Sequence, residues 1–361
     1  MLNGLRRLAV NARLVGALHG RKPRLIRRML GGYLKAARHG GRIGSLRFMD
    51  IALDYTCNFH CQHCSALALD RGRKAERLTI DDYRRVAGEA MDMGVCAFHF
   101  TGGEPSLRKD LFEIVRAFRP AENLISIQTN GWFADEKFLD HFREAGGDIV
   151  CVSVDSATAE DHDAFRSRKG SWQRAISALE LARSKGFQTL MSSTVTHGNL
   201  GSGELAQLVE LSRGMGAILS LNLAVPAGEW RGHADLLLTE EDRRTLNQLL
   251  ERHPHVRTDF ESNWKIRGCP AFKEKCYLSP YGDVLPCPFI QVSFGNVRSE
   301  SLEQIRATAL SHPYLQSYYP ICIAAEDKHF IDSAGCYGVE VSSLPISHED
   351  SPLFRSQPPE A

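Results

Sequence analysis

The sequence predicts an α/β fold built on a parallel sheet, followed by a small cysteine-rich region and preceded by a basic helical arm. Short apolar runs alternate with amphipathic stretches from about residue 48. Cysteine, proline and glycine concentrate between residues 269 and 296. The first 49 residues contain no acidic side chain. Strands that alternate with helices form parallel sheets, either open or partly closed into a barrel.

The formal net charge of only +1 over 361 residues is the sum of a basic arm and an acidic remainder. Residues 1–49 hold 12 Lys or Arg, so the remainder carries a net charge of −11. A basic amphipathic helix is typical of anionic membrane surfaces, but it can equally pack on the acidic remainder of its own chain. RNA binding is a weaker alternative, because few aromatic residues interleave the basic ones. One predicted helical stripe holds Ile26, Met29, Leu30, Tyr33, Leu34 and Ala37, and the other mostly Arg24, Arg28, Lys35 and Arg38.

Six apolar runs after the arm have the length and composition of strands, and the segments between them have helical periodicity. The strands are predicted at 49–55, 97–101, 124–129, 149–154, 190–195 and 219–225. The helices are predicted at 80–93, 110–118, 136–145, 172–185, 204–213, 240–251 and 301–310. Ligands of such a fold gather at the carboxyl ends of the strands.

The chain contains ten cysteines, and their role depends on the compartment in which it works. No apolar run is long enough to span a membrane, and the N-terminus lacks a secretory signal pattern. We therefore expect a cytoplasmic protein, at most peripheral on the inner membrane face through the arm. Clustered cysteines in that compartment favour metal binding or catalysis.

The first cysteine cluster is Cys57, Cys61 and Cys64, directly after the first predicted strand. Three thiolates can hold a [4Fe–4S] cluster and leave one iron without a protein ligand. Zinc is an alternative, with His60 or His63 as fourth ligand, and a disulfide is a weaker one. The next strand ends in Gly102-Gly103-Glu104-Pro105, a turn in which glycines permit close backbone approach and the carboxylate can pair with an ammonium group.

The two motifs together resemble the radical S-adenosylmethionine (radical SAM) superfamily over roughly residues 49–226. The resemblance implies a partial (β/α)6 barrel in which the three cysteines hold [4Fe–4S]. It implies that SAM binds the open iron and is cleaved reductively to a 5′-deoxyadenosyl radical, with an electron donor such as flavodoxin or ferredoxin. Glu104 and the backbone of Gly102 and Gly103 would hold the methionine end, and His63 would lie beside the adenine.

Four further residues lie at strand ends or just beyond, where a cofactor in a barrel mouth would be in reach. We expect contacts with SAM from Asn130, Ser153, Asp155 and Arg166. Turn and capping chemistry explains the same residues equally well. Cys96 and Cys151 lie in apolar strand segments and are predicted to be buried structural thiols.

The second cysteine set resembles the SPASM/twitch extension of radical SAM enzymes. Cys269 and Cys287 flank a predicted hairpin around Tyr281-Gly282-Asp283, and a short helix follows. The resemblance implies one auxiliary iron–sulfur cluster, since the further cysteine run of a full SPASM module is missing. The expected ligands are Cys269, Cys287, Cys322 and Cys336, with Cys276 as a rival. A three-ligand cluster that binds substrate and a vestigial loop of buried thiols remain open.

These features predict a basic arm (1–47), a radical SAM barrel (48–238), a linking helix (239–264), an auxiliary-cluster domain (265–344) and a disordered tail (345–361). The expected activity is hydrogen abstraction from an unidentified small molecule or lipid. Peptide or protein maturation is the first alternative, and a non-catalytic electron carrier or zinc scaffold is the second. The loop with Glu229, Arg231 and His233 follows the last barrel strand, where substrate should enter. No catalytic acid or base is assigned, and no specific nucleic acid is expected.

Overall fold

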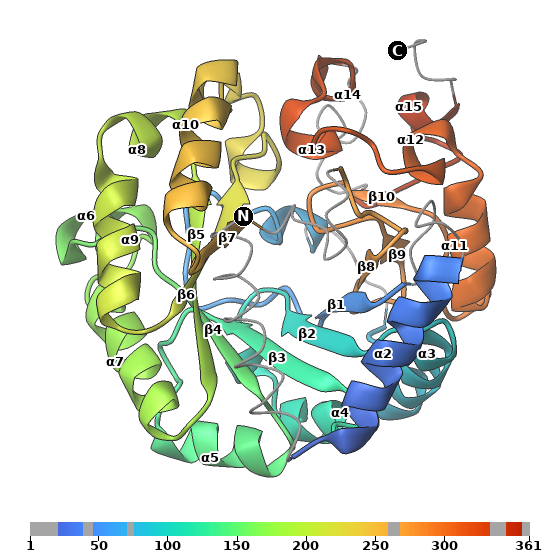
Figure 1. The fold of residues 1–361 in the computed structure, drawn as a ribbon. Coiled ribbons are helices and arrows are strands. Elements are labelled where there is room, and N and C mark those ends of the chain that lie inside the picture. The colour runs from blue at the N-terminus through green and yellow to red at the C-terminus, as the bar shows by residue number, and fades with distance from the viewer. Residues whose placement is uncertain (1–20, 39–45, 71–75, 259–267, 333–343, 356–361) are drawn as a thin grey trace.

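The computed structural model describes residues 21–38, 46–70, 76–258, 268–332 and 344–355 (Figure 1). The strands are β1 (Phe48–Ala52), β2 (Ala97–Thr101), β3 (Leu124–Thr129), β4 (Ile149–Ser153), β5 (Gln188–Val195), β6 (Ile218–Leu223), β7 (Val256–Thr258), β8 (Lys275–Leu278), β9 (Val284–Leu285), β10 (Val292–Ser293) and β11 (Ile346–Ser347). The longer helices are α2 (Pro23–Arg38), α3 (Ile80–Asp92), α4 (Leu111–Ala117), α5 (Glu136–Glu144), α6 (Ala159–Phe165), α7 (Ser171–Ser184), α9 (Glu204–Gly214), α10 (Glu240–Arg252) and α11 (Leu302–Leu310). Short helices are α8 (His197–Gly201), α12 (Pro313–Gln316), α13 (Ile323–Glu326), α14 (Lys328–Asp332) and α15 (Pro352–Arg355).

The main sheet has nine strands in the order β7-β6-β5-β4-β3-β2-β1-β8-β9. All neighbours are parallel except β9, which runs antiparallel to β8. The sheet curves around a central space, and α4, α5, α7 and α9 cover its outside (Figure 1). The predicted partial barrel is therefore confirmed, and each of the six predicted barrel strands is present.

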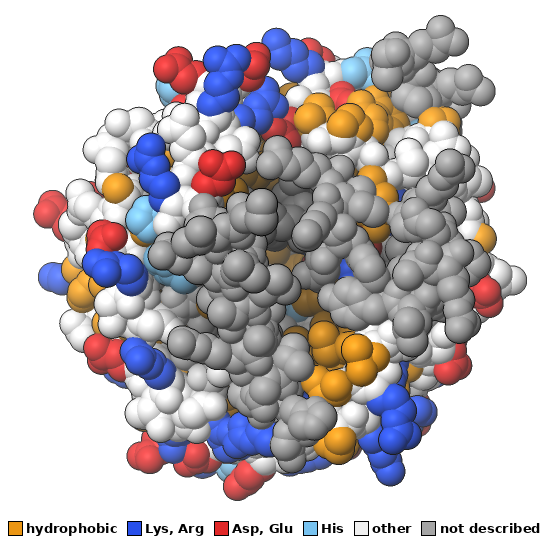
Figure 2. All heavy atoms as spheres, in the orientation of Figure 1, with side chains coloured by type: hydrophobic (Ala, Val, Ile, Leu, Met, Phe, Trp, Pro, Cys, Tyr) orange, Lys and Arg blue, Asp and Glu red, His pale blue; other side chains and the backbone are white. Residues whose placement is uncertain are grey.

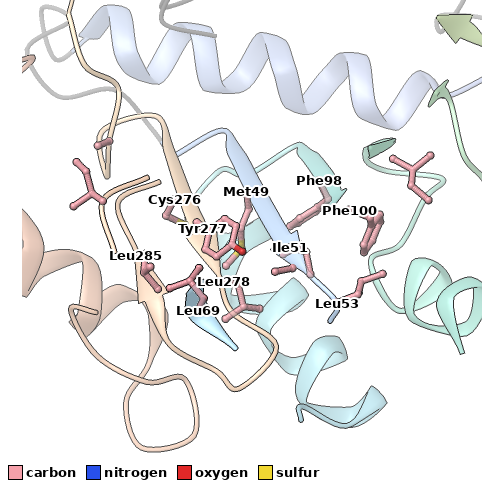
Figure 3. Packing of buried hydrophobic residues seen from close by; sticks show 14 of the residues in the cluster. Met49, Ile51, Leu53, Leu69, Phe98, Phe100, Cys276, Tyr277, Leu278 and Leu285 are labelled. Carbon is pink, nitrogen blue, oxygen red and sulfur yellow. The ribbon is translucent and has the colours of Figure 1, made fainter. Parts of the chain in front are cut away.

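The sheet extends beyond those six strands at both edges. β7 adds to β6, within the segment expected to be only a linking helix. The predicted hairpin forms from β8 and β9, and β8 pairs in parallel with β1. Cys276 and Leu278 of β8 lie among the buried residues that also include Met49 and Ile51 of β1 (Figure 3). The cysteine-rich region thus continues the barrel sheet, because alternate residues of β8 complete the hydrophobic layer of β1.

Helix α2 packs against the loops that precede β2, β3 and β4. The ammonium group of Lys22 donates to the carbonyls of Asn123 and Gly146 and to the carboxylate of Asp148. Arg28 donates to the carbonyl oxygens of Glu122, Met91 and Val95 and to the side chain of Asn123. Of the two interpretations of the arm, contact with the rest of its own chain is the one that Lys22 and Arg28 support.

The apolar stripe predicted for the arm differs from the buried face of α2. Leu25 is fully buried, whereas Leu30 is 59% exposed and Ile26 and Met29 are half-buried. Figure 2 shows basic side chains next to an apolar patch where α2 lies in Figure 1. The stripe was predicted from periodicity alone. Periodicity cannot show that backbone carbonyls at the edge of the barrel bind Lys22 and so determine which face of the helix is buried. Among the described residues, no helix is long and apolar enough to cross a membrane.

The expectation of a disordered tail is wrong for residues 345–355. β11 pairs in parallel with β10, and α15 follows it. Leu353 and Phe354 are buried, and the Phe354 ring lies 5.0 Å from that of Phe294. Ile346 is buried as well, so three apolar side chains pack this segment on the protein. The overall composition of the segment, rich in proline and serine, did not predict this packing.

Candidate cluster and cofactor site

The loop after β1 places Cys57, Cys61 and Cys64 on the wall of one cavity of about 390 Å³. The amide of Cys64 donates to the carbonyl of Cys61 at 3.2 Å, which keeps the loop curled. Burial raises the pKa of the Cys57 thiol to about 12, and the charges of Glu104, Cys61 and Cys64 add to this effect. The three thiols are therefore close enough for their charges to interact in this buried cavity.

Gly102 and Gly103 line the same cavity and also contact the loop that carries the cysteines. The amides of Gly103 and Glu104 donate to the carbonyls of Asp54 and Thr56 at 2.8 and 2.9 Å. A Cβ at Gly102 would lie 2.1 Å from the Asp54 carbonyl oxygen, and one at Gly103 would lie 2.2 Å from that of Thr56. The expected close backbone approach is real, but its partner is the loop that leads to Cys57.

Glu104 is buried, and its carboxylate lies in a network of donors. Oε1 accepts from the Ser106 amide (3.1 Å), the Ser106 hydroxyl (2.6 Å) and the Thr129 hydroxyl (2.8 Å), and Oε2 accepts from the Asn130 amide (2.7 Å). Burial raises the pKa of Glu104, and these donors oppose that effect. The Asn130 side chain donates to Asn58 Oδ1 at 2.8 Å, which links the third strand end to the cluster loop.

His63 is stacked against Phe165, with ring centroids 4.9 Å apart, and Trp230 lies 5.7 Å from it. Burial lowers the pKa of His63 to about 4, so the imidazole is neutral. Its Nδ1 is buried and has no hydrogen-bond partner within the part of the chain that the structure describes. An orphaned ring nitrogen on a cavity wall fits a polar ligand that reaches the stack of His63 and Phe165.

Asp155 and Arg166 form a buried ion pair next to the cluster loop. Arg166 Nε lies 2.6 Å from Asp155 Oδ2, and Nη1 lies 3.6 Å from the Sγ of Cys61. Burial would raise the pKa of Asp155, but the guanidinium holds it below its ordinary value. Ser153 lines the same cavity and accepts from Gln128 at 2.8 Å. The structure therefore brings all eight predicted cofactor contacts to the first cysteine loop or to strand ends beside it.

The loop after β6 does contact the site, through a residue that the sequence analysis passed over. Trp230 lines the cavity with the three cysteines. A Cβ at Gly228 would lie 2.2 Å from the Cys64 carbonyl oxygen, so this loop lies directly on the cluster loop. Glu229 and His233 instead line a second cavity of about 460 Å³, together with His60 and Gln62.

Two cysteines of the second set lie near each other. The charge of Cys269 contributes to raising the pKa of Cys287, after burial as the main cause. The amide of Cys269 donates to the Tyr319 carbonyl at 2.7 Å, which brings the segment with Cys322 alongside. Cys336 lies outside the described residues. Cys276 is fully buried, and unlike its neighbours Lys275 and Tyr277 it does not line the cavity.

The donor set fits a cluster better than a single ion. Within the described ranges, no three His, Cys, Asp or Glu side chains converge closely enough to hold one metal ion. The zinc interpretation of Cys57, Cys61 and Cys64 therefore has no preformed site. Three cysteine thiols on the wall of one open cavity suit a polynuclear iron–sulfur cluster.

The interior of the barrel carries a polar belt that the sequence analysis missed. His99 Nδ1 lies 2.8 Å from the Ser126 hydroxyl, and Lys275 Nζ lies 4.0 Å from Asp50. All four line the cavity, and so does Cys151, which is buried as predicted but faces inward. Polar residues at alternate positions of otherwise apolar strands are the signal that could have identified this belt.

Comparison with known proteins agrees with both motifs. The radical SAM superfamily matches residues 54–211, and the SPASM iron–sulfur cluster-binding domain matches residues 269–323. An AdoMet-dependent heme synthase of Methanosarcina barkeri is 28% identical over 69% of this chain and 78% of its own length. A PqqA peptide cyclase of Rhizobium meliloti is 26% identical over 79% of this chain and 80% of its own.

The fold also resembles solved structures. Streptococcus suis SuiB bound to precursor peptide SuiA superposes with a TM-score of 0.59 at 16% identity, covering 78% of this chain and 68% of SuiB. Residues of both matched regions line the cavity described above. The chain is an enzyme of the radical SAM superfamily with a C-terminal SPASM domain, and its cofactors are [4Fe–4S] clusters and SAM.

Proposed function

We propose that this enzyme modifies a peptide or protein by hydrogen abstraction in the barrel cavity. In this proposal Cys57, Cys61 and Cys64 hold the [4Fe–4S] cluster that binds SAM. When bound, these cofactors supply a 5′-deoxyadenosyl radical. Glu104 and Asn130 lie where they can hold the methionine end, and the neutral His63 can meet the adenine through its unpaired nitrogen.

The observation that carries the proposal is that one cavity joins the two matched regions. Its wall includes the first cysteine loop as well as Pro288 and Phe289. These two residues directly follow Cys287, a proposed ligand of the auxiliary cluster with Cys269 and Cys322. A substrate in this cavity would thus lie near both the radical source and the auxiliary cluster. Iron–sulfur clusters are redox centres, so the auxiliary cluster could accept an electron there.

The polar belt around His99 determines which substrate groups the cavity can bind. Below the strand ends the wall carries the carboxylate of Asp50, the ammonium of Lys275 and the imidazole of His99. Burial lowers the pKa of His99 to about 4, so it offers a neutral donor or acceptor. The floor is apolar, from Phe48 and Leu190 among others. A recess with an apolar floor and a polar belt suits a single amino-acid side chain presented by a longer peptide.

The names of the relatives support a peptide over the lipid or small molecule expected from the basic arm. A PqqA peptide cyclase and a mycofactocin maturase are similar over 79% and 69% of this chain, and SuiB was solved with a precursor peptide. The lipid expectation rested on the arm, and Lys22 and Arg28 of the arm are engaged with the barrel. Similarity to heme synthases favours a second candidate, a tetrapyrrole-like small molecule.

The test compares the two substrate classes on the full-length, anaerobically reconstituted protein. Short peptides encoded beside its gene and porphyrin substrates are each incubated with SAM and a reductant. We expect 5′-deoxyadenosine to rise above the level without substrate only when a peptide is added. A mass change on that peptide should accompany the rise and be missing in a Cys57→Ala/Cys61→Ala/Cys64→Ala control. Product formation from porphyrins alone would overturn the peptide proposal in favour of the second candidate.

A further inference from the structure

Lys273 is the most unusual charged residue outside the first cysteine loop. Its side chain is 0% exposed. Its Nζ has no hydrogen-bond partner among the residues that the structure describes. Lysine is rarely buried unless it is paired, because desolvation of an ammonium group is unfavourable. A buried ammonium without a partner therefore points to a negatively charged group that the polypeptide itself does not supply.

The backbone fixes the direction of this side chain. The amides of Lys273 and Glu274 both donate to the Pro270 carbonyl, at 3.0 and 2.8 Å. Arg306 of α11 donates to the carbonyls of Phe272 and Lys273, at 2.7 and 3.2 Å. The turn after Cys269 is thus held from both sides, so Lys273 cannot reach solvent by a small rotation of the chain.

Within the described ranges, Lys273 forms no ion pair with a carboxylate. The adjacent Glu274 accepts from Arg47 at 2.5 Å and from the Tyr318 hydroxyl at 2.6 Å. The charges that act on Lys273 are those of Cys269, which is attractive, and Arg306, which is repulsive. The centroid of the Tyr318 ring lies 5.9 Å from Nζ. Burial lowers the pKa of Lys273 to about 8, as expected for an ammonium without a counter-charge.

We propose that Lys273 is the counter-charge of the auxiliary iron–sulfur cluster and raises its reduction potential. The inference rests on the proposed role of Cys269 as a ligand of that cluster. A cluster held by thiolates is an anion, and its charge becomes more negative on reduction. A fixed positive charge in a dry environment therefore stabilises the reduced form more than the oxidised form. Lys273 acts on the cluster as a positioning residue and does not touch substrate.

The test isolates the auxiliary cluster in the full-length chain. The Cys57→Ala/Cys61→Ala/Cys64→Ala background removes the SAM-binding cluster, so that any remaining EPR signal belongs to the second site. Redox titrations followed by EPR then compare Lys273→Met, which keeps the shape and removes the charge, with Lys273→Arg, which keeps the charge. Lys328→Met is the matched control, because Lys328 is an exposed lysine of the same region.

We expect Lys273→Met to lower the ratio of reduced to oxidised cluster at a fixed potential by at least tenfold, equivalent to 59 mV for one electron. Lys273→Arg and Lys328→Met should stay near the parent value. Equal potentials in all variants would overturn the role of Lys273 and leave the cluster intact. Absence of iron and sulfide from the parent background would overturn the auxiliary cluster itself. If Lys273→Met does not fold, Lys273→Gln decides the question by the same titration.

Discussion

The guanidinium of Arg166 lies 3.6 Å from the Sγ of Cys61 while it pairs with Asp155. One cation thus serves a buried carboxylate and a proposed cluster ligand. Removing one partner of a buried ion pair costs about 3–5 kcal/mol, because the other charge stays buried. We predict that Arg166→Met lowers the free energy of unfolding by that amount in urea titrations. The exposed Arg84→Met should change it by less than about 1 kcal/mol. Equal stability of the two variants would contradict this account of Arg166.

The contact between Gly103 and Thr56 predicts a variant that loses iron. A Cβ at Gly103 would overlap the Thr56 carbonyl oxygen, so Gly103→Ala must displace the loop that carries Cys57. We expect it to reconstitute with less than half the iron of the parent protein. Gly31→Ala is the matched control, because nothing lies within 4 Å of a Cβ at that helical position. It should bind iron normally, and an exposed helical glycine-to-alanine change typically stabilises by about 1 kcal/mol. Full iron content in Gly103→Ala would show that the close contact between Gly103 and Thr56 does not position the cysteine loop.

His162 predicts how stability depends on pH. Its Nδ1 accepts from the Asp155 amide at 3.2 Å, and burial lowers its pKa to about 4. Between about pH 4 and 6.5 the unfolded chain therefore binds more protons than the folded chain, and the free energy of unfolding rises with pH. One such histidine contributes a slope of about 1.4 kcal/mol per pH unit in this window.

We expect His162→Gln to lose that part of the slope below pH 6.5 and to show no further change above it. Denaturant unfolding from pH 4 to 8 measures the slope for parent and variant. His329→Gln, at an exposed position of α14, provides the comparison. An unchanged slope in His162→Gln would show that the residue is not held neutral.

The ion pair of Lys22 leads us to predict that the basic arm stabilises the folded protein. Lys22 and Asp148 are both buried, and Asp148 also accepts from the Ile125 amide at 2.8 Å. Lys22→Met should therefore lower the free energy of unfolding by about 3–5 kcal/mol. Lys22→Met/Asp148→Asn should recover part of this loss, since it removes the stranded charge. A double variant as unstable as the sum of the single variants would argue against the pairing.

The fold was predictable from the sequence to the extent that it depends on periodicity. β2 and β3 have the predicted bounds, and α3 begins at the predicted residue, Ile80. β7 was missed because three residues carry too little periodicity to be recognised. The pairing of β8 with β1 was missed because it joins strands more than two hundred residues apart, and local pattern does not encode such partners.

The candidate site was predictable where short motifs carry the chemistry, and not where topology does. The first cysteines and Glu104 were identified from their spacing. Trp230 was not, because a single aromatic residue in a loop has no distinctive pattern. The belt around His99 was not, because its members come from different strands, and only the folded sheet brings their alternating positions together. Lys273 was missed because only its burial without a hydrogen-bond partner within the described residues sets it apart, and the sequence does not show this.

The central claim is that Cys57, Cys61 and Cys64 hold the cluster at which SAM is cleaved. The most direct measurement is 5′-deoxyadenosine formed from SAM after anaerobic reconstitution and reduction, compared with the Cys57→Ala/Cys61→Ala/Cys64→Ala variant. We predict about eight iron atoms and product formation in the parent protein, and about four iron atoms without product in the variant. 5′-Deoxyadenosine that persists in the variant would contradict the account.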